Sequence, residues 1–308
     1  MIGHNKVRDR FSKSVSKNAL SHAHLIIGED GIGKSLLADD EFAYKILGIP
    51  SQREHVDIVH YKSEKASFGV DLVRNIIAEA NKKPYECDRK VIIIHNGEKL
   101  TVAAQNALLK TIEEPLTGIF IIILSSNIDS ILETIRSRCQ IHRLAPLSKE
   151  EINLYISKKY NGIDDELNRT LISFSEGIPG RVDKFMNDDI FKDIRNTVIE
   201  MLKDIGHGKI EVPIKYSDKF YSMKGNEEEI LETITIFARD SIIFKEIENN
   251  LSIINGDKID DIREIASNLS YNKLNRIIKV VNEARNNLKS NTNLWLTLDS
   301  MLISILEE

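Results

Sequence analysis

The residues of this chain that are best suited to chemistry form a Gly-x-x-x-x-Gly-Lys-Ser sequence near the N-terminus. The glycines of this loop, Gly28, Gly31 and Gly33, allow the backbone to curl until successive N–H groups point at phosphate oxygens. Lys34 can then reach the β- and γ-phosphates of a nucleotide, and Ser35 can ligate Mg²⁺. The motif therefore predicts a phosphate-binding loop that can take ATP or ADP with Mg²⁺.

The acidic residues that a hydrolysing site needs are absent from the position where they are expected. In P-loop motor enzymes, a later strand ends in an Asp that holds the Mg²⁺ water shell, followed by a Glu that polarises the attacking water. After the strand predicted over residues 91–94, this chain has His95 and Asn96 instead. Imidazole is a poor ligand for Mg²⁺ and an amide has no basicity, and Glu98 lies one residue too far along. We interpret the loop as one that binds nucleotide weakly or not at all and does not hydrolyse it, unless another carboxylate substitutes.

Two further polar groups flank the last strands. Asn127, in the sequence Ser-Ser-Asn, stands where a γ-phosphate would be sensed, although Ser and Asn are also ordinary turn residues. Arg138 stands just before the last strand, at the rim of the predicted sheet. An arginine in a loop is most often solvated or salt-bridged. In this position, we expect an arginine finger that contacts the nucleotide of a neighbouring subunit, because the planar guanidinium can bind a phosphate with two hydrogen bonds.

The elements that must position these residues alternate between strand and helix patterns through the first 145 residues. Apolar or β-branched runs predict strands over residues 25–27, 56–61, 91–94 and 119–124, and a fifth follows Cys139. This alternation predicts a parallel five-stranded sheet with helices on both faces. The all-apolar fourth strand suits the centre of the sheet. The spacing over residues 102–114 predicts an amphipathic helix that ends at Pro115.

Composition and charge limit the class of protein. The chain has 308 residues, 42% of them hydrophobic, and a net charge of −5, so any contact with nucleic acid must be local or shared with partners. The N-terminal residues are too polar for a signal peptide and no apolar run could cross a membrane, which predicts a cytoplasmic protein. The two cysteines, Cys87 and Cys139, are too few for a disulfide framework or a cysteine-based zinc site. We therefore expect no metal cluster.

The second half of the chain has helical patterns throughout. Ser148 and Glu151 predict a capping box at the start of a small helical segment. From about residue 190, apolar residues recur at helical spacing in two stripes, most simply explained as internal core. The stripes contain Leu274, Ile277, Ile278, Val281, Ala284 and Leu288, and then Leu294, Leu298, Met301, Leu302 and Ile305. Residues 191–308 contain 16 Lys and Arg against 20 Asp and Glu, a net charge of −4, which favours protein over DNA contacts.

Together these motifs resemble the bacterial clamp-loader subunits of DNA polymerase III, which belong to the AAA+ class. The resemblance rests on Met1-Ile2-Gly3-His4, Ser21-His22-Ala23-His24, the phosphate loop, the run from Ala104 to Pro115, and Ser137-Arg138-Cys139. It is specific as far as about Arg181 and looser beyond. The gamma and tau motor subunits carry four zinc-binding cysteines after the loop helix and an intact acidic pair. Because this chain has neither, the resemblance favours the delta-prime type, without the zinc module found in many delta-prime proteins.

The resemblance implies three domains. They are an α/β P-loop AAA+ domain over residues 1–145, a small helical lid over 146–189 and an all-α collar over 190–308 that joins five subunits into a ring. It also implies that Arg138 is an arginine finger acting in trans and that Arg181 is the second-sensor arginine. For Arg181, an ordinary surface position after a Pro-Gly turn is an equally good interpretation.

The function implied by the resemblance is that of a structural, non-hydrolysing subunit that helps load the sliding clamp onto primed DNA. Its implied partners are the gamma/tau motor subunits and the delta subunit, and, through the assembled complex, the sliding clamp and primer-template DNA. The alternative is an autonomous or gamma/tau-like AAA+ ATPase that uses the phosphate loop itself. The two interpretations differ in the residues that follow the third strand, His95 and Asn96.

Overall fold

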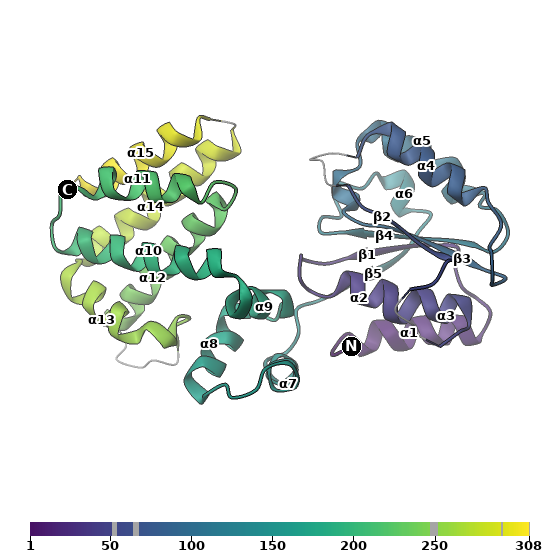
Figure 1. Cartoon of the computed structure of the whole chain (residues 1–308), viewed down its shortest axis with the longest axis horizontal. Coiled ribbons are helices and arrows are strands. Elements are labelled where there is room, and N and C mark those ends of the chain that lie inside the picture. The colour runs from purple at the N-terminus through teal and green to yellow at the C-terminus, as the bar shows by residue number, and fades with distance from the viewer. Residues whose placement is uncertain (51–53, 64–67, 247–251, 291, 308) are drawn as a thin grey trace. The chain divides into compact units, whose positions relative to one another are not determined.

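The computed structural model describes the whole chain except residues 51–53, 64–67, 247–251, 291 and 308. The chain forms two compact units (Figure 1). The first consists of Met1–Lys158 and Glu176–Gly180, and the second of Lys159–Ser175 and Arg181–Glu308. The three-domain division at residues 145 and 189 stays a prediction about which segments act as separate domains.

A parallel five-stranded sheet forms the centre of the first unit, in the order β2-β3-β4-β1-β5. Its strands are β1 (Ala23–Ile27), β2 (Ile58–Tyr61), β3 (Lys90–Ile94), β4 (Ile119–Ser125) and β5 (Gln140–Arg143). The predicted parallel sheet is confirmed, and β4 pairs with a neighbour on each side. The second strand begins at Ile58 rather than at Val56, because Val56 lies before the first ladder pair and is 48% exposed.

Helices cover both faces of this sheet (Figure 1). They are α1 (Asn5–Ser16), α2 (Lys34–Leu36), η1 (Leu37–Ala43), α3 (Tyr44–Leu47), α4 (Val70–Ala80), η2 (Gly97–Lys99), α5 (Val102–Glu113) and α6 (Glu133–Arg136). α4, α5 and α6 pack over one apolar core, and α1, η1 and α3 pack over another on the opposite face. The amphipathic helix predicted before Pro115 is α5. The Thr101 hydroxyl caps it by accepting the N–H of Ala104.

The helix that follows the phosphate loop is continuous over Lys34–Leu47 but is not regular. Its middle part, η1, is a π-helix, which is wound more widely than an α-helix. Leu37, Phe42 and Ala43 of this segment are buried in the core beneath the sheet. The π-helix therefore determines which side chains of Lys34–Leu47 face the sheet.

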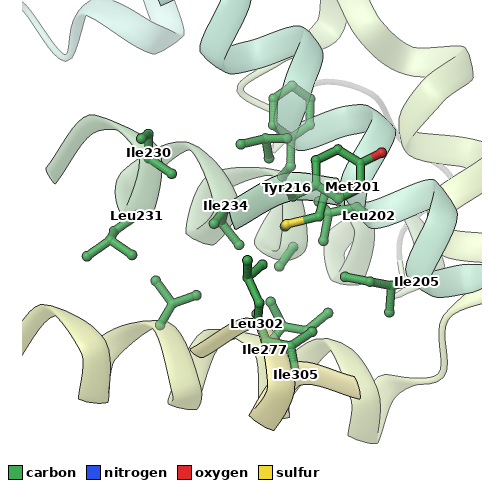
Figure 2. Packing of buried hydrophobic residues seen from close by; sticks show 14 of the residues in the cluster. Met201, Leu202, Ile205, Tyr216, Ile230, Leu231, Ile234, Ile277, Leu302 and Ile305 are labelled. Carbon is green, nitrogen blue, oxygen red and sulfur yellow. The ribbon is translucent and has the colours of Figure 1, made fainter. Parts of the chain in front are cut away.

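The second unit is helical over its described residues. Its helices are α8 (Asp165–Ser175), most of α9 (Pro179–Asn187), α10 (Asp189–Gly206), α11 (Val212–Ser222), α12 (Glu227–Glu246), η4 (Gly256–Lys258), α13 (Ile259–Asn268), α14 (Tyr271–Lys289) and α15 (Leu294–Leu306). The two predicted apolar stripes lie on α14 and α15 and face a shared core. In Figure 2, Ile277, Leu302 and Ile305 meet residues of α10, α11 and α12 there. Among the described helices of the whole chain, none is both long enough and apolar enough to span a bilayer.

The predicted capping box is confirmed at the start of α7 (Lys149–Lys159). The backbone N–H of Ser148 donates to Glu151 Oε2 at 2.9 Å, and the N–H of Glu151 donates to Ser148 Oγ at 3.2 Å. Just before it, the N–H of Leu147 donates to the carbonyl of Gly177 at 2.8 Å. This bond attaches the segment Glu176–Gly180 to the first unit, close to the phosphate loop.

Candidate functional site

The Gly-rich loop lies between the end of β1 and the start of α2, where a phosphate-binding loop is expected. Gly31 and Gly33 have φ angles of +83° and +108°, a backbone region that residues with a Cβ rarely adopt. Gly28 donates its N–H to the carbonyl of Ser125 on β4 at 3.2 Å, which fixes the loop to the centre of the sheet. Gly31 and Gly33 therefore lie in the backbone region that favours glycine, as a curled loop requires.

Lys34 is bound within its own loop. Its ammonium group donates to the carbonyls of Gly28 and Glu29 at 2.6 and 3.0 Å and to Asp30 Oδ1 at 2.8 Å. The Lys34 side chain is 11% exposed, whereas that of Asp30 is 77% exposed. A phosphate group that enters the loop would therefore compete with the exposed Asp30 carboxylate for this cation.

Two other segments of the first unit contact the loop. His4 Nε2 lies 3.2 Å from the carbonyl oxygen of Ile32. The N–H of Gly180 donates to the carbonyl of Gly31 at 2.9 Å, and a Cβ on Gly180 would lie 2.5 Å from Gly31 Cα. Only glycine fits this close approach. Arg181, the predicted second sensor, is the next residue in the chain and the first of its segment in the second unit.

His95, directly after β3, lies beside the residue expected to ligate Mg²⁺. Its Nδ1 is 3.5 Å from Ser35 Oγ, and its Nε2 is 3.1 Å from Nδ1 of His60 on the neighbouring strand β2. Burial is the main cause that lowers the pKa of His95 to about 4, and electrostatic repulsion from His60 and Lys62 contributes to the same shift. His95 is therefore uncharged near neutral pH.

The Glu98 carboxylate is engaged by hydrogen bonds at the ends of β3 and β4. Its carboxylate accepts the N–H of Ser126 at 3.0 Å and the side-chain amide of Asn96 at 3.3 Å. Burial raises the pKa of Glu98, but the hydrogen bonds from Ser126 and Asn96 outweigh this effect and leave it below the usual value. This carboxylate caps the turn after β4.

Asn127 lies two residues beyond β4 and is part of a tight turn. Its side-chain oxygen accepts the N–H of Asp129 at 2.9 Å, and its backbone carbonyl accepts the hydroxyls of Ser125 and Ser130 at 2.8 and 2.7 Å. These bonds are those of the turn that was the alternative interpretation of this sequence. A role for Asn127 as a phosphate sensor stays a prediction.

Arg138 lies between α6 and β5, with its side chain 41% exposed. Its Nε is 2.6 Å from Glu113 Oε1, and its Nη1 donates to the carbonyl of Thr134 at 2.9 Å. The Glu113 side chain, at the end of α5, is itself 42% exposed. The guanidinium is thus held at the surface of the first unit by an exposed carboxylate and by a backbone carbonyl.

The structure brings together a cluster that sequence reasoning missed. His55, Asp57 and Cys87 offer ligand atoms within 4.8 Å of one another. Both oxygens of Asp57 are already in use, since they accept the N–H groups of Tyr85, Glu86 and Cys87 at 2.6 to 2.9 Å. Burial raises the pKa of the Cys87 thiol, which disfavours the thiolate that metals bind. No local pattern could reveal this cluster, because about 30 residues separate its two halves. Its hydrogen bonds instead hold the loop before β3.

Two family models match most of the chain. One, described as DNA polymerase III, delta subunit, matches residues 3–148. The other, described as DNA polymerase III, delta subunit, C terminal, matches residues 191–307. The first covers the phosphate loop and Ser137-Arg138-Cys139, and the second covers the two apolar stripes of α14 and α15.

Named relatives agree with these models. The chain is 24% identical over 311 residues to the DNA polymerase III subunit delta-prime of Bacillus subtilis. This alignment covers 96% of this chain and 93% of that protein. It is 29% identical over 248 residues to the subunit of the same name from Escherichia coli, covering 78% of this chain and 70% of that protein.

The fold itself is shared with a solved structure. A DNA polymerase III gamma subunit-related protein of Thermotoga maritima aligns with a TM-score of 0.50 at 17% identity, covering 97% of this chain and 98% of that one. At this identity, the likeness concerns the fold alone. From the two family models and the two delta-prime relatives, we conclude that this chain belongs to the family of DNA polymerase III delta-prime subunits.

Proposed function

We propose that this chain is a structural subunit of the DNA polymerase III clamp loader that does not hydrolyse ATP itself. The observation that carries this proposal is the end of β3. There, His95 takes the place of the acid that would hold Mg²⁺, and the Glu98 carboxylate is bound to the N–H of Ser126. Asn96 has no basicity, and burial lowers the pKa of His95 to about 4, so neither is suited to activate water near neutral pH.

The phosphate loop can serve as a binding site without turnover. The N–H groups of the loop and the Lys34 ammonium would hold the phosphates of ATP or ADP once Lys34 exchanges Asp30 for a phosphate oxygen. Ser35 would hold an accompanying Mg²⁺. Asn127 and Arg181 are the candidate sensors of the γ-phosphate. A bound nucleotide would then stabilise the fold of this subunit rather than drive its motion.

Arg138 is the residue that would act on a neighbour. Its exposed guanidinium is paired with Glu113 at the surface, and exposed pairs of this kind contribute only about 0 to 1 kcal/mol. A γ-phosphate of an adjacent motor subunit carries more charge than one carboxylate, so it can displace Glu113. The guanidinium would then stabilise charge in the transition state of the neighbour's reaction.

The proposed partners follow from this role. The gamma/tau motor subunits would supply the active sites, and the delta subunit would complete the ring. Residues 190–308 would act as the collar, since the net charge of −4 over residues 191–308 suits protein contacts better than DNA phosphates. The sliding clamp and primer-template DNA would be contacted through the assembled complex.

The experiment that tests this role uses the reconstituted clamp loader with Arg138→Ala in this subunit. Clamp loading should fall, and hydrolysis at the one affected motor site should fall by up to about a thousandfold, while assembly is unchanged. Arg138→Lys should rescue only in part, because an ammonium lacks the bidentate geometry of guanidinium. Arg143→Ala, which removes an exposed arginine from β5, is the matched control.

A second arm measures phosphate release by the isolated chain. We expect no more release than from its Lys34→Ala variant. Turnover that disappears with Lys34→Ala would make this chain an ATPase in its own right. Normal clamp loading by an assembled Arg138→Ala complex would reduce the Arg138 loop to a structural element.

A further inference from the structure

The edge of the sheet beside the phosphate loop carries three side chains with metal-binding atoms. His60 lies near the end of β2, His95 follows β3, and Asp39 lies on the π-helix η1 beside His60. We propose that His60, His95 and Asp39 form a binding site for a divalent transition-metal ion such as Zn²⁺ or Co²⁺. This inference goes beyond the proposed function, because it requires neither a nucleotide nor a partner subunit.

Two of the distances among these atoms, both measured from His60 Nδ1, are short enough for a shared ion. His60 Nδ1 is 3.1 Å from His95 Nε2 and 3.8 Å from Asp39 Oδ1. Two imidazole nitrogens that bind one tetrahedral ion at 2.0 to 2.1 Å are about 3.3 Å apart. A small adjustment of either ring therefore converts the observed contact into a ligand pair. With His60 Nδ1 and His95 Nε2 on the ion, His95 Nδ1–H would face Ser35 Oγ, now 3.5 Å away, as an outer partner.

Asp39 supplies an independent observation that points to a cation. Its Oδ1 atom is shielded from solvent and accepts no hydrogen bond from the described residues. Burial raises the pKa of Asp39, since the carboxylate loses water without gaining a full partner. A buried carboxylate oxygen without a donor is costly. A metal ion between Asp39 and the two imidazoles would supply the missing positive charge.

The chemistry of the ligands selects the class of ion. Two imidazoles and one carboxylate suit Zn²⁺, Co²⁺ or Ni²⁺, whereas Mg²⁺ prefers oxygen ligands. Asp39 and His60 also line a surface hollow of about 570 Å³, so an ion and its remaining water ligand can enter from solvent. Sequence reasoning about zinc considered the two cysteines and therefore could not detect this set of ligands.

The same hollow is lined by His55, which belongs to the His55–Asp57–Cys87 cluster. This second cluster is the natural competitor for a metal ion. Its Asp57 is engaged by three N–H groups, while Asp39 is not. The two clusters also differ in chemistry, since only the competitor offers a sulfur ligand.

The test is titration of the untagged full chain, first freed of metal with a chelator, with Co²⁺ by absorption and with Zn²⁺ by calorimetry. We expect one ion per chain and a Co²⁺ spectrum without a thiolate charge-transfer band. His60→Gln, His95→Gln and Asp39→Asn should each weaken binding by at least about tenfold. His55→Gln and Cys87→Ser should bind as the unaltered chain does. Each variant is compared with the unaltered chain by circular dichroism to show that it is folded.

Three outcomes would overturn the proposal. The first is that the unaltered chain binds neither ion. The second is that binding survives in the double variant His60→Gln/His95→Gln. The third is that binding is lost in His55→Gln or Cys87→Ser and the spectrum shows a thiolate band, which would place the ion in the competing cluster. All measurements are made without nucleotide, so they do not depend on whether the phosphate loop binds ATP.

Discussion

Two pairs of histidines lie on neighbouring strands at opposite edges of the same sheet, and the two histidines of each pair have the same offset in strand register. His24 on β1 is in register with Gln140 of β5, and His142 lies two residues further along β5. His60 on β2 is in register with Ile93 of β3, and His95 lies two residues beyond it. In both pairs, a ring nitrogen of one histidine is 3.1 Å from a ring nitrogen of the other.

What covers the two pairs is different. His24 and His142 lie under Phe11 and Phe42, whose rings stack with centroids 3.5 Å apart and contact the imidazoles edge-on. Over the other pair, η1 places Asp39 instead of an aromatic ring. The backbone thus fixes the contact between two imidazoles, and the residue above it decides whether the pair is a sealed core element or an accessible ligand set.

The largest effect should come from acid acting on the sealed pair. Burial lowers the pKa of His24 to about 3 and that of His142 to about 4, helped by the charges of His142 and His22 on His24 and of Arg10 on His142. The unfolded chain takes up these protons near pH 6.5, and the folded chain does not. The contribution of these two neutral imidazoles to the free energy of unfolding is therefore fully present above pH 6.5, and it is lost as the pH falls toward 4. At pH 5 the loss should be about 2 kcal/mol for each imidazole, or about 4 kcal/mol together.

The measurement is hydrogen exchange of the β1 and β5 amides between pH 8 and pH 5, corrected for intrinsic exchange. The fluorescence of Trp295, the single tryptophan, reports on the second unit and serves as an internal control. His142→Gln should remove about half of the pH dependence. Equal protection of these strands at both pH values would contradict the assigned burial of the pair.

A smaller effect should follow from opening the cover of the sealed pair. Phe11→Ala removes a fully buried ring that stacks on Phe42, and substitutions of this kind destabilise by about 3 kcal/mol. Water that enters the cavity should also raise the pKa values of His24 and His142. Proton titration by NMR measures both shifts. If the variant is destabilised but neither pKa changes, the Phe11 ring contributes to packing and is not what keeps water from His24 and His142.

The smallest effect is expected at the open pair. His60 is 45% exposed at its side chain, so His60→Gln should change the free energy of unfolding by less than about 0.5 kcal/mol. Chemical denaturation followed by hydrogen exchange of β2 measures this change. A loss of several kcal/mol would mean that this pair is a structural element like the other one.

Patterns that are local in the chain predicted most of the fold. The loop glycines, the apolar run of β4, the capping box of Ser148 and Glu151, and the stripes of α14 and α15 all depend on residues within a few turns or one strand. Each of these patterns reports burial or backbone form directly, and each agrees with the structure.

Contacts between distant segments could not be predicted in this way. His24 and His142 are 118 residues apart, and His60 and His95 are 35 apart. Their meeting depends on strand order and register, which one sequence does not specify. The partner of Arg138, Glu113, depends likewise on how α5 packs beside the turn before β5. For the same reason, the π-helix could not be foreseen, because its apolar spacing still resembles that of an α-helix.

The π-helix η1 also has a mechanical consequence. Residues before it are oriented by the phosphate loop, and residues after it are oriented by the core under Phe11. The wider winding of the π-helix sets the angle by which the helix after it is rotated, about the common helix axis, relative to the helix before it. Removing one residue from Leu37–Ala43 would turn one half relative to the other by about 100°. Lys34 before the π-helix and Ile46 after it, which is buried in the core with Phe11, could then not both keep their present orientations.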